Sequence, residues 1–370
     1  MISFVWSSKY PFIACSGGSE TYTAGQIREL LRRGIPARII TIGHSIHDGR
    51  DDFPDIPFLA LDTVDQLGEL DDLLVYITYP LEVKTKHQAY AILHCPPPTY
   101  QHGDPLYNKH AFKGVRLITA SKFAAGMWWR NLRYTVGRMP TVYPFADEAF
   151  AAAVRGSRPG AGEPIRILFA GRLHPDKGIY TLLAALHMET LKDKNYTLTV
   201  TTAGSNTEDG DIILNMLQAH PNIKVVTARK SAADMAELMA RHDVVVMPSS
   251  DIFWQELFGM LSIEAQHAGC RVVASRSGGL PETNLGGVLF IHPDNPQSLA
   301  SGMAEAIRRG SLSQRERAAA ARRFTVKQSV DSLLRSVAYQ TYLNHTGPAA
   351  RSVITRVGQP QIARPHRVSA

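Results

Sequence analysis

Two glutamates flank a predicted helix start in the stretch SSDIFWQELFGMLSIEAQ, residues 249–266. Glu256 precedes the dipeptide Phe258-Gly259, and Glu264 lies in the second turn of the helix that we expect to begin there. A glycine at a helix start lets a ligand approach the backbone closely, and the free N–H groups of the first turn attract the oxygens of a diphosphate. A carboxylate beside them can accept two hydrogen bonds from sugar hydroxyls. Helix capping by the two acids explains the pattern equally well.

A basic loop, FAGRLHPDKG, follows a predicted strand and precedes another predicted helix. Arg172 and Lys177 lie at opposite ends of this loop, and Gly171 allows the backbone to turn sharply. Two cations beside a helix start suit phosphate oxygens. The loop is not a P-loop, because the pattern GxxxxGK(S/T) is absent. On spacing alone, a solvated basic loop is an equally good interpretation.

Two further candidate positions follow predicted strands in the first half of the chain. Gly17 and Gly18 lie in SGGSE, a flexible segment before a predicted helix, although the GxGxxG fingerprint is absent. His94 ends the strand-like run YAILH, directly before a cysteine and three prolines. A lone histidine is more often structural. Ligands of doubly wound sheets bind beyond the carboxyl ends of strands, however, and this favours a functional role for His94.

Two other patterns have simpler interpretations. Asp209-Gly210-Asp211 has the form of a metal-binding motif, but it precedes a predicted helix, where acids complement the helix dipole. We therefore predict helix capping and no metal site there. The stretch MWWRNLRYTVGR, residues 127–138, combines aromatics with three arginines and no acids. This stretch could contact an anionic membrane or a nucleic acid. Ordinary packing of Trp128 or Trp129 beside a solvated basic face explains it at least as well.

Short apolar runs alternate with helical patterns twice along the chain. We predict strands at residues 2–6, 37–42, 73–78, 90–94, 115–120 and 141–144, with helices such as 20–33 and 121–133 among them. A Gly/Pro/Arg-rich linker near Arg155 separates these from a second series of strands, IRILFAG, YTLTVTTAG, IKVVT, DVVVMPS, RVVAS and GVLFI. The alternation predicts two domains, each with a parallel sheet covered by helices on both faces.

The end of the chain is predicted to be helical and then flexible. Helices are expected over residues 296–309, 312–323 and 326–343, with Thr325 as the N-cap of the last one. From Thr346 to Ala370 the chain contains four arginines and no acids, which predicts a loosely attached basic tail.

Size and composition fit two soluble domains, since the chain has 370 residues, of which 44% are hydrophobic and 20% charged. It contains no apolar run of about 18 residues, and we predict no secretory signal at its N-terminus. Three widely spaced cysteines favour a reducing, cytosolic setting. The net charge of +7 indicates an anionic partner, such as a phosphorylated ligand or a membrane surface. Because zinc-finger and RNA-recognition signatures are absent, we expect no specific nucleic-acid partner.

Taken together, these loops resemble the retaining glycosyltransferases of the GT-B fold, glycosyltransferase family 4 (glycosyl transferases group 1). The resemblance rests on SGGSE, FAGRLHPDKG and MPSSDIFWQELFGMLSIEAQHAGCRVVASRSGGLPE, the last with the family's two glutamates eight positions apart. It is strongest over residues 166–309. It implies an α/β fold of two Rossmann-like, doubly wound parallel-sheet domains facing across a cleft. The implied units are an acceptor domain (1–155), a nucleotide-sugar donor domain (164–325), a helix returning to the first domain (326–345) and a basic tail (346–370).

The resemblance also implies a role for each matching residue. Arg172 and Lys177 would neutralise the donor diphosphate, Glu264 would bind the ribose, and Glu256 would contact the transferred sugar. His94 matches a histidine beside the reacting centre. The expected catalytic set is His94, Glu256, Arg172 and Lys177. The expected donor-binding set is Gly17, Gly18, Arg172, Lys177, Glu256, Leu257, Phe258, Gly259, Met260 and Glu264.

The chain departs from the family pattern at two places in its first half. Residues 143–147, YPFAD, stand where the family often has Asn-Gly-x-Asp, and the strand at 73–78 lacks a histidine often found there. Neither departure concerns the residues expected to bind the donor diphosphate. Both leave the acceptor unassigned.

The implied reaction is transfer of a hexose from a UDP- or GDP-linked sugar to a hydroxyl of a glycan, lipid or small metabolite, with retention of configuration. Arg172, Lys177 and the helix start would supply the positive charge that a metal supplies elsewhere, so we predict neither metal nor other cofactor. A GT-B epimerase and a non-catalytic nucleotide-sugar or membrane-surface binding module remain alternatives. We expect a cytoplasmic protein. The sequence leaves open whether the protein contacts the inner face of the membrane and what its oligomeric state is. It also leaves the donor base open, and residues 227–231 are the candidates to contact that base.

Overall fold

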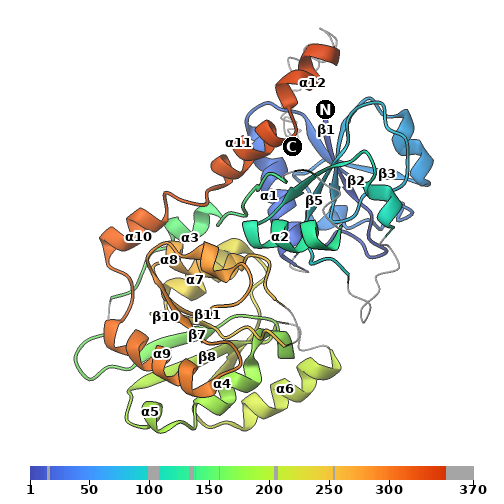
Figure 1. Cartoon of the computed structure of the whole chain (residues 1–370). Helices are drawn as coiled ribbons and strands as arrows, with labels where there is room; N and C mark the ends of the chain where they lie inside the picture. Colours follow the sequence, from blue (N-terminus) through green and yellow to red (C-terminus); the bar gives the residue numbers. More distant parts are fainter. Residues whose placement is uncertain are drawn as a thin grey trace, which may run out of the picture.

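The computed structural model of the chain contains two parallel sheets of six strands each, one above the other in Figure 1. It describes residues 1–14, 17–98, 108–132, 137, 139–157, 159–203, 207–252 and 255–346. The first sheet has the order β3-β2-β1-β4-β5-β6, with strands β1 (Ile2–Trp6), β2 (Ala37–Ile42), β3 (Phe58–Leu61), β4 (Leu73–Ile77), β5 (Tyr90–Leu93) and β6 (Arg116–Thr119). The second has the order β12-β11-β10-β7-β8-β9, with strands β7 (Ile165–Phe169), β8 (Tyr196–Thr201), β9 (Ile223–Val226), β10 (Val244–Met247), β11 (Arg271–Ser275) and β12 (Val288–Ile291).

Both sheets follow the same doubly wound order, in which the first strand pairs with the fourth. β1 pairs with β4, and β7 pairs with β10. The order of strand addition reverses at these pairs, and doubly wound sheets bind ligands at such switch points, beyond the carboxyl ends of the strands. The predicted fold of two parallel-sheet domains is confirmed. We call the first sheet with its covering helices the N-terminal domain, and the second the C-terminal domain.

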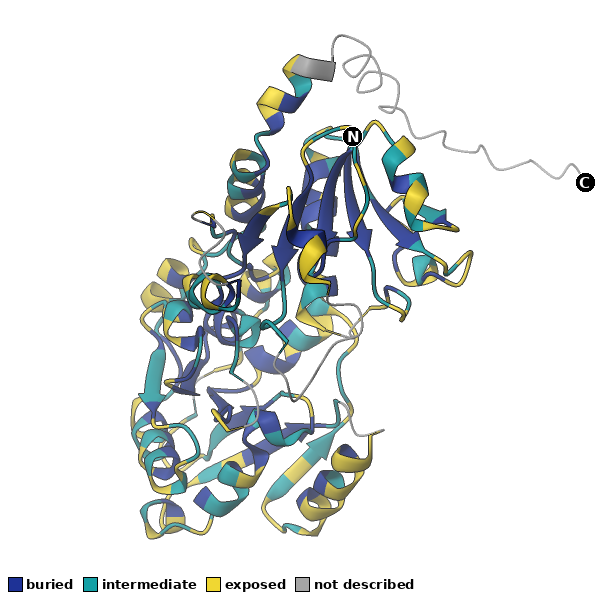
Figure 2. Ribbon diagram, turned by 45° about the vertical axis from the view of Figure 1, so that its right-hand side comes forward, coloured by how far each residue is buried: buried dark blue, intermediate teal, exposed yellow. Residues whose placement is uncertain are grey.

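Helices cover both faces of each sheet, because successive residues of a strand point to opposite faces. In β10, Val244 and Val246 join one apolar layer, whereas Val245 and Met247 join the other. Figure 2 shows the buried strands between helices whose outer sides are exposed. The helices are α1 (Gly18–Arg32), α2 (Lys122–Asn131), α3 (Glu148–Ala152), α4 (Ile179–Ala185), α5 (Glu189–Lys192), α6 (Glu208–Ala219), α7 (Ala232–Ala240), α8 (Met260–Ala268), α9 (Pro296–Arg309), α10 (Gln314–Ala320), α11 (Val326–Ser336) and α12 (Tyr339–Thr346).

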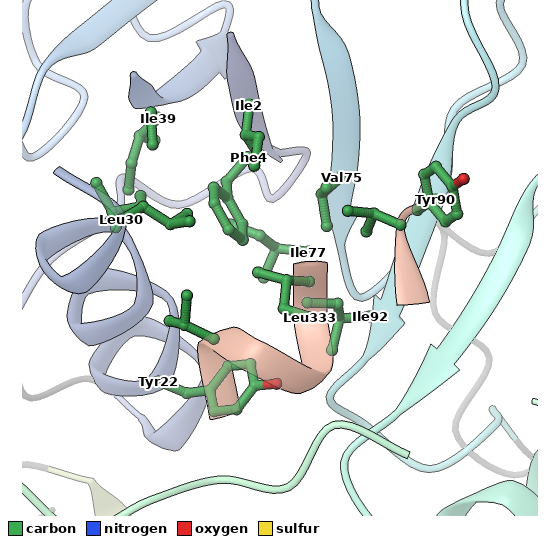
Figure 3. Packing of buried hydrophobic residues seen from close by; sticks show 14 of the residues in the cluster. Ile2, Phe4, Tyr22, Leu30, Ile39, Val75, Ile77, Tyr90, Ile92 and Leu333 are labelled. Carbon is green, nitrogen blue, oxygen red and sulfur yellow. The ribbon is translucent and has the colours of Figure 1, made fainter. Parts of the chain in front are cut away.

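The last helices pack against the first sheet, far from them in the sequence. Val330 and Leu333 of α11 are buried in the same apolar layer as Phe4 and Ile92 of the first sheet, and Leu333 lies close to Ile92 in Figure 3. The hydroxyl of Ser329 donates to the carbonyl of Tyr143 at 2.8 Å. The chain therefore crosses between the domains twice, once near residue 145 and once before α11.

Three sequence predictions of secondary structure need correction. Residues 141–144 form no strand: Thr141 makes one isolated bridge to Thr119, and the chain then leaves the sheet toward the C-terminal domain. The short edge strand β3 was not predicted. The helix predicted over 326–343 is interrupted between α11 and α12, where Ala338 has a φ of 48°. The N-cap prediction for Thr325 is confirmed, since its side chain accepts from the N–H of Gln328. In the described part of the chain, no helix is long and apolar enough to cross a membrane.

Candidate functional site

The loops that follow β7 and β10 pack against each other at the switch point of the C-terminal domain. The N–H of Ser250 donates to the carbonyl of Asp176 at 2.9 Å. Gly178 has a φ of 71°, and a Cβ atom built on it would lie 1.8 Å from the carbonyl oxygen of Pro248. Only glycine fits a left-handed position pressed against a neighbouring backbone. The basic loop and the glutamate loop are therefore held in one arrangement.

Lys177 and Glu256 form an ion pair across these two loops. Nζ of Lys177 donates to Oε1 of Glu256, and each side chain is 18% exposed. The hydroxyl of Ser249 lies 3.5 Å from the same oxygen. Arg172 is more open: its side chain is 60% exposed, and its Nη2 lies 3.6 Å from Oδ2 of Asp176. The structure thus gathers Arg172, Lys177 and Glu256 at one edge of the sheet, with the guanidinium group accessible to a ligand.

Asp176 is a residue of this site that the sequence analysis missed. Its carboxylate is 4% exposed and lies 2.7 Å from Nδ1 of His174 and 3.7 Å from Nζ of Lys177. It is also the acid that pairs with Arg172. A buried acid between two cations holds both on the same side of the loop, so Asp176 positions them. The signal was present in the sequence, as the one acid in the loop FAGRLHPDKG.

The start of α8 is built by close backbone packing. Gly259 precedes the helix with a φ of 94°. Cβ atoms built on Gly278 and Gly279 would lie 2.2 Å and 2.0 Å from the carbonyl oxygens of Glu256 and Leu257, respectively. The side chains of Leu257 and Phe258 are buried. This segment can therefore offer mainly backbone groups to a ligand.

Glu264 lies in the second turn of α8 as a partly buried acid. In the described part of the chain, its carboxyl group takes part in no hydrogen bond or ion pair. Burial raises the pKa of Glu264 to about 7, and the negative charge of Asp147 adds to this effect. The group is therefore close to half-ionised at neutral pH and has unused hydrogen-bonding capacity.

The N-terminal domain brings the start of α1 close to the start of α8. Gly17 caps α1 in an extended conformation. A Cβ atom built on Gly18 would lie 3.5 Å from the sulfur of Met260, the first residue of α8. Ser16, which precedes the two glycines, lies outside the described residues. The predicted glycine pair and the predicted helix start are therefore neighbours at the seam between the domains.

His94 follows β5 in the N-terminal domain. Its Nε2 atom is buried and has no hydrogen-bond partner among the described residues. The ring packs edge-on against Tyr22 of α1, with ring centroids 4.9 Å apart. Burial lowers the pKa of His94 to about 3. The imidazole is therefore neutral near pH 7. No described contact joins His94 to Lys177, Glu256 or Glu264.

Among the described residues, the remaining sequence patterns make no contact with Lys177 or Glu256, although Oδ2 of Asp209 lies 3.7 Å from Nε2 of His174 in the basic loop. Trp128 is buried and its indole N–H donates to the carbonyl of Cys95 at 2.8 Å, whereas Trp129 is exposed. Asp209 and Asp211 lie inside the first turn of α6, because this helix begins earlier than predicted. Among the described residues, no three His, Cys, Asp or Glu side chains gather as metal ligands. Residues 133–136 and 138 and the tail 347–370 lie outside the described part of the chain.

Two hollows lie apart from the ion pair. One has a volume of about 450 Å³. It is lined by residues 227–230, which follow β9, by Asp234 and Glu237 of α7, and by Arg241 directly after α7. It adjoins the segment for which we predicted contact with the donor base. The other, of about 700 Å³, lies in the N-terminal domain between the starts of β5 and β6 and Ser336 of α11, and none of the predicted site residues line it.

Comparison with known proteins gives one family and one fold. Residues 164–309 match the family described as glycosyl transferases group 1. Glycogen synthase from Mycobacterium tuberculosis (strain CDC 1551 / Oshkosh) is 31% identical over 173 residues, which cover 45% of this chain and 40% of that protein. The chain thus spans less than half the length of this curated relative.

Solved structures match over most of the chain. A glycosyltransferase from Rickettsia africae superposes with a TM-score of 0.66 at 17% identity, covering 91% of this chain and 97% of the other. HepE from Anabaena, solved in complex with UDP and glucose, has a TM-score of 0.62 at 17% identity, covering 91% of this chain and 99% of its own. This chain therefore has the GT-B fold, and residues 164–309 of its C-terminal domain match the glycosyl transferases group 1 family.

Proposed function

We propose that this protein is a retaining glycosyltransferase that moves a hexose from a nucleoside-diphosphate sugar to a hydroxyl group of an acceptor. The observation that carries the proposal is the cluster of Arg172, Lys177 and Glu256 at the switch point of a domain that matches glycosyl transferases group 1. The similarity to a glycogen synthase, and the UDP and glucose bound to HepE, support a sugar nucleotide as donor.

Donor binding exchanges the ion pair for contacts with the ligand. The diphosphate takes the place of Glu256 beside Lys177, while the exposed Arg172 approaches it from the other end of the loop. Glu256 then accepts hydrogen bonds from hydroxyls of the transferred sugar. Glu264, which has unused acceptor capacity, takes the ribose hydroxyls. Backbone N–H groups around Phe258 and Gly259 complete the diphosphate site, and Gly17-Gly18 covers it from the N-terminal domain.

The reaction needs positive charge where the leaving group develops negative charge. As the bond between C1 of the sugar and the diphosphate breaks, the electron pair goes to the leaving oxygen. Arg172, Lys177 and the start of α8 stabilise that charge, so that no metal ion is required. The acceptor hydroxyl attacks C1 from the same face and transfers its proton to the leaving diphosphate, which retains the anomeric configuration. His94, neutral at pH 7, positions the sugar at the reacting carbon.

The test is turnover of UDP- and GDP-linked hexoses by the full chain in buffer containing EDTA, with and without candidate hydroxyl acceptors. Proton NMR follows donor loss and the anomeric configuration of the product. We expect acceptor-dependent transfer with retention, unaffected by EDTA. An epimerase would convert the donor sugar without an acceptor, and a binding module would bind the donor without turnover. Either result would contradict the proposal.

A further inference from the structure

Glu282 of the C-terminal domain forms three hydrogen bonds with the part of the chain that precedes α3. It lies in η5 (Leu280–Thr283), directly after the Gly278-Gly279 turn. Its Oε2 accepts from the N–H of Lys122 at 3.0 Å and from the hydroxyl of Tyr143 at 2.7 Å. Its Oε1 accepts from the N–H of Phe123 at 2.8 Å. One carboxylate therefore joins the two domains through three donors.

Two of these donors are the first N–H groups of helix α2. The first N–H groups of a helix have no partner within the helix and need an external acceptor. The N-cap Ser121 accepts from the N–H of Ala124 at 2.9 Å, which leaves Lys122 and Phe123 without an acceptor on their own helix. Glu282 supplies both, and its charge also complements the positive end of the helix dipole. The start of α2 is thus completed by the other domain.

The same helix start is tied to the glutamate loop. The hydroxyl of Ser121 donates to the carbonyl of Leu257 at 2.5 Å. Within the C-terminal domain, the N–H of Gly279 donates to the carbonyl of Glu256 at 2.7 Å. Glu282 and Ser121 therefore hold α2 against the segment 256–258 from two sides.

Aromatic packing supports the third hydrogen bond. The ring of Tyr143 packs against Phe258, with centroids 5.6 Å apart, and against Phe324, at 5.3 Å. Burial and the hydrogen bond to Glu282 raise the pKa of Tyr143, so its hydroxyl keeps the proton that it donates.

We propose that Glu282 is an interdomain positioning residue, which locks the start of α2 onto the segment 256–258 and so holds Glu256 and the start of α8 in register with the N-terminal domain. Its consequence for catalysis rests on the proposed function, whereas the contact itself does not. Transfer needs groups from both domains in one geometry, and a displacement of about 1 Å can cost roughly 100-fold in rate. Arg172, Lys177 and Glu264 all lie in the C-terminal domain, so we expect binding of the nucleotide alone to depend much less on this contact than transfer does.

The contact is tested first without any ligand, by hydrogen–deuterium exchange of the full chain. In Glu282→Ala, we expect the amides of residues 121–125 and of the segment 256–262 to exchange about tenfold faster or more than in the unaltered chain. Tyr143→Phe removes one hydrogen-bond donor and keeps the ring, so it should accelerate amide exchange in the same two regions by a smaller factor. Glu237→Ala, which removes an exposed acid paired with Arg241 in the same domain, is the matched control and should leave both regions unchanged. Unchanged exchange in Glu282→Ala would overturn the proposal, and so would acceleration confined to 121–125.

The catalytic consequence is tested by steady-state kinetics with UDP-glucose and by titration with UDP. We expect Glu282→Ala to lower kcat about tenfold or more while the Kd for UDP changes less than twofold, and Glu282→Gln to recover part of kcat. An unchanged kcat, or equal losses of kcat and UDP affinity, would overturn the positioning role. If the unaltered chain neither binds UDP nor uses UDP-glucose, that result bears on the proposed donor, and the exchange measurement still decides whether Glu282 joins the domains.

Discussion

The ammonium group of Lys177 and the carboxylate of Glu256 neutralise each other across two loops, although the residues stand 79 positions apart in the chain. Each side chain is 18% exposed, so both charges are largely shielded from water before a ligand arrives. Removing Lys177 would leave the partly buried carboxylate of Glu256 without its cation, which is costly. Arg172 differs, because its exposed side chain has a long contact to Asp176 at 3.6 Å. The two cations should therefore respond differently to mutation.

Arg172→Ala should abolish most activity while leaving the protein folded. We expect kcat/KM for donor turnover to fall roughly 100-fold or more, as for other residues that stabilise developing charge. The free energy of unfolding should change by less than about 0.5 kcal/mol, since the side chain is exposed. Arg308→Ala is the matched control, because Arg308 is an exposed arginine paired with Glu305 in the same domain. Near-normal turnover by Arg172→Ala would show that Arg172 is not part of the donor site.

Gly178→Ala should destabilise the protein and separate the two loops. Its Cβ atom would lie 1.8 Å from the carbonyl oxygen of Pro248, so one loop must move. Gly34→Ala is a control with the same φ of 71° and nothing within 4 Å of the added atom. Both substitutions carry the cost of a left-handed residue, about 1 kcal/mol. We expect Gly178→Ala to lose about 1–3 kcal/mol more in urea unfolding, and to lower donor affinity. Equal losses in the two variants would show that the loops are not pressed together.

Donor affinity should rise with pH near neutrality because of Glu264. Its carboxyl group has a pKa of about 7 without ligand, and the ionised form is the better acceptor for two ribose hydroxyls. Between pH 6 and pH 8 the ionised fraction rises about tenfold, so the Kd for an intact sugar nucleotide should fall about tenfold. Calorimetric titration at several pH values measures this, and Glu264→Gln should bind more weakly with no such dependence. A flat profile for the unaltered chain would contradict the role of Glu264.

The same raised pKa has an opposite effect on folding stability. Between the ordinary value of 4.5 and about 7, the unfolded carboxyl group has lost its proton and the folded one keeps it. The folded state then binds more protons, so the contribution of Glu264 to stability is present below pH 4.5 and is lost as the pH rises through 7. Urea unfolding of the unaltered chain and of Glu264→Gln across this window should show the difference.

His94→Phe should keep the fold and lose transfer. Phenylalanine preserves ring packing against Tyr22 and removes a buried nitrogen that has no partner among the described residues. Thermal stability should therefore be unchanged or slightly higher, whereas kcat should fall roughly 100-fold if His94 lies at the reacting carbon. Because the folded pKa is about 3 and the ordinary value is 6.5, His94 lowers stability as the pH falls through this window, and His94→Phe should remove that loss. Full activity of His94→Phe would assign His94 a structural role.

The sequence allowed the sheets to be predicted because their strands are short, apolar and buried. β1, β2 and α9 have the predicted bounds. The edge strand β3 was missed because it is short and only partly buried. Residues 141–144 were misassigned because the segment leaves the sheet after one bridge: Val142 still packs in the apolar layer of the first sheet, whereas Tyr143 packs against the C-terminal domain. Local patterns carry no information on such long-range partners.

The candidate site was predictable in its residue types and not in its contacts. The helix start and the basic loop could be placed at strand ends from the order of the elements alone. The pairing of Lys177 with Glu256, the burial of Asp176 and the three bonds of Glu282 depend on how separate loops pack, which spacing along the chain does not specify.

Binding of a nucleoside-diphosphate sugar by the C-terminal domain is the central claim, and a thermal-shift screen of UDP-, GDP- and ADP-linked sugars tests it most directly. A bound donor raises Tm by mass action. The account predicts that at least one donor raises the Tm of the unaltered chain in a concentration-dependent way, and that Arg172→Ala and Glu264→Gln show clearly smaller shifts with the same donor. Equal shifts in all three proteins, or no shift with any of these sugars, would contradict it.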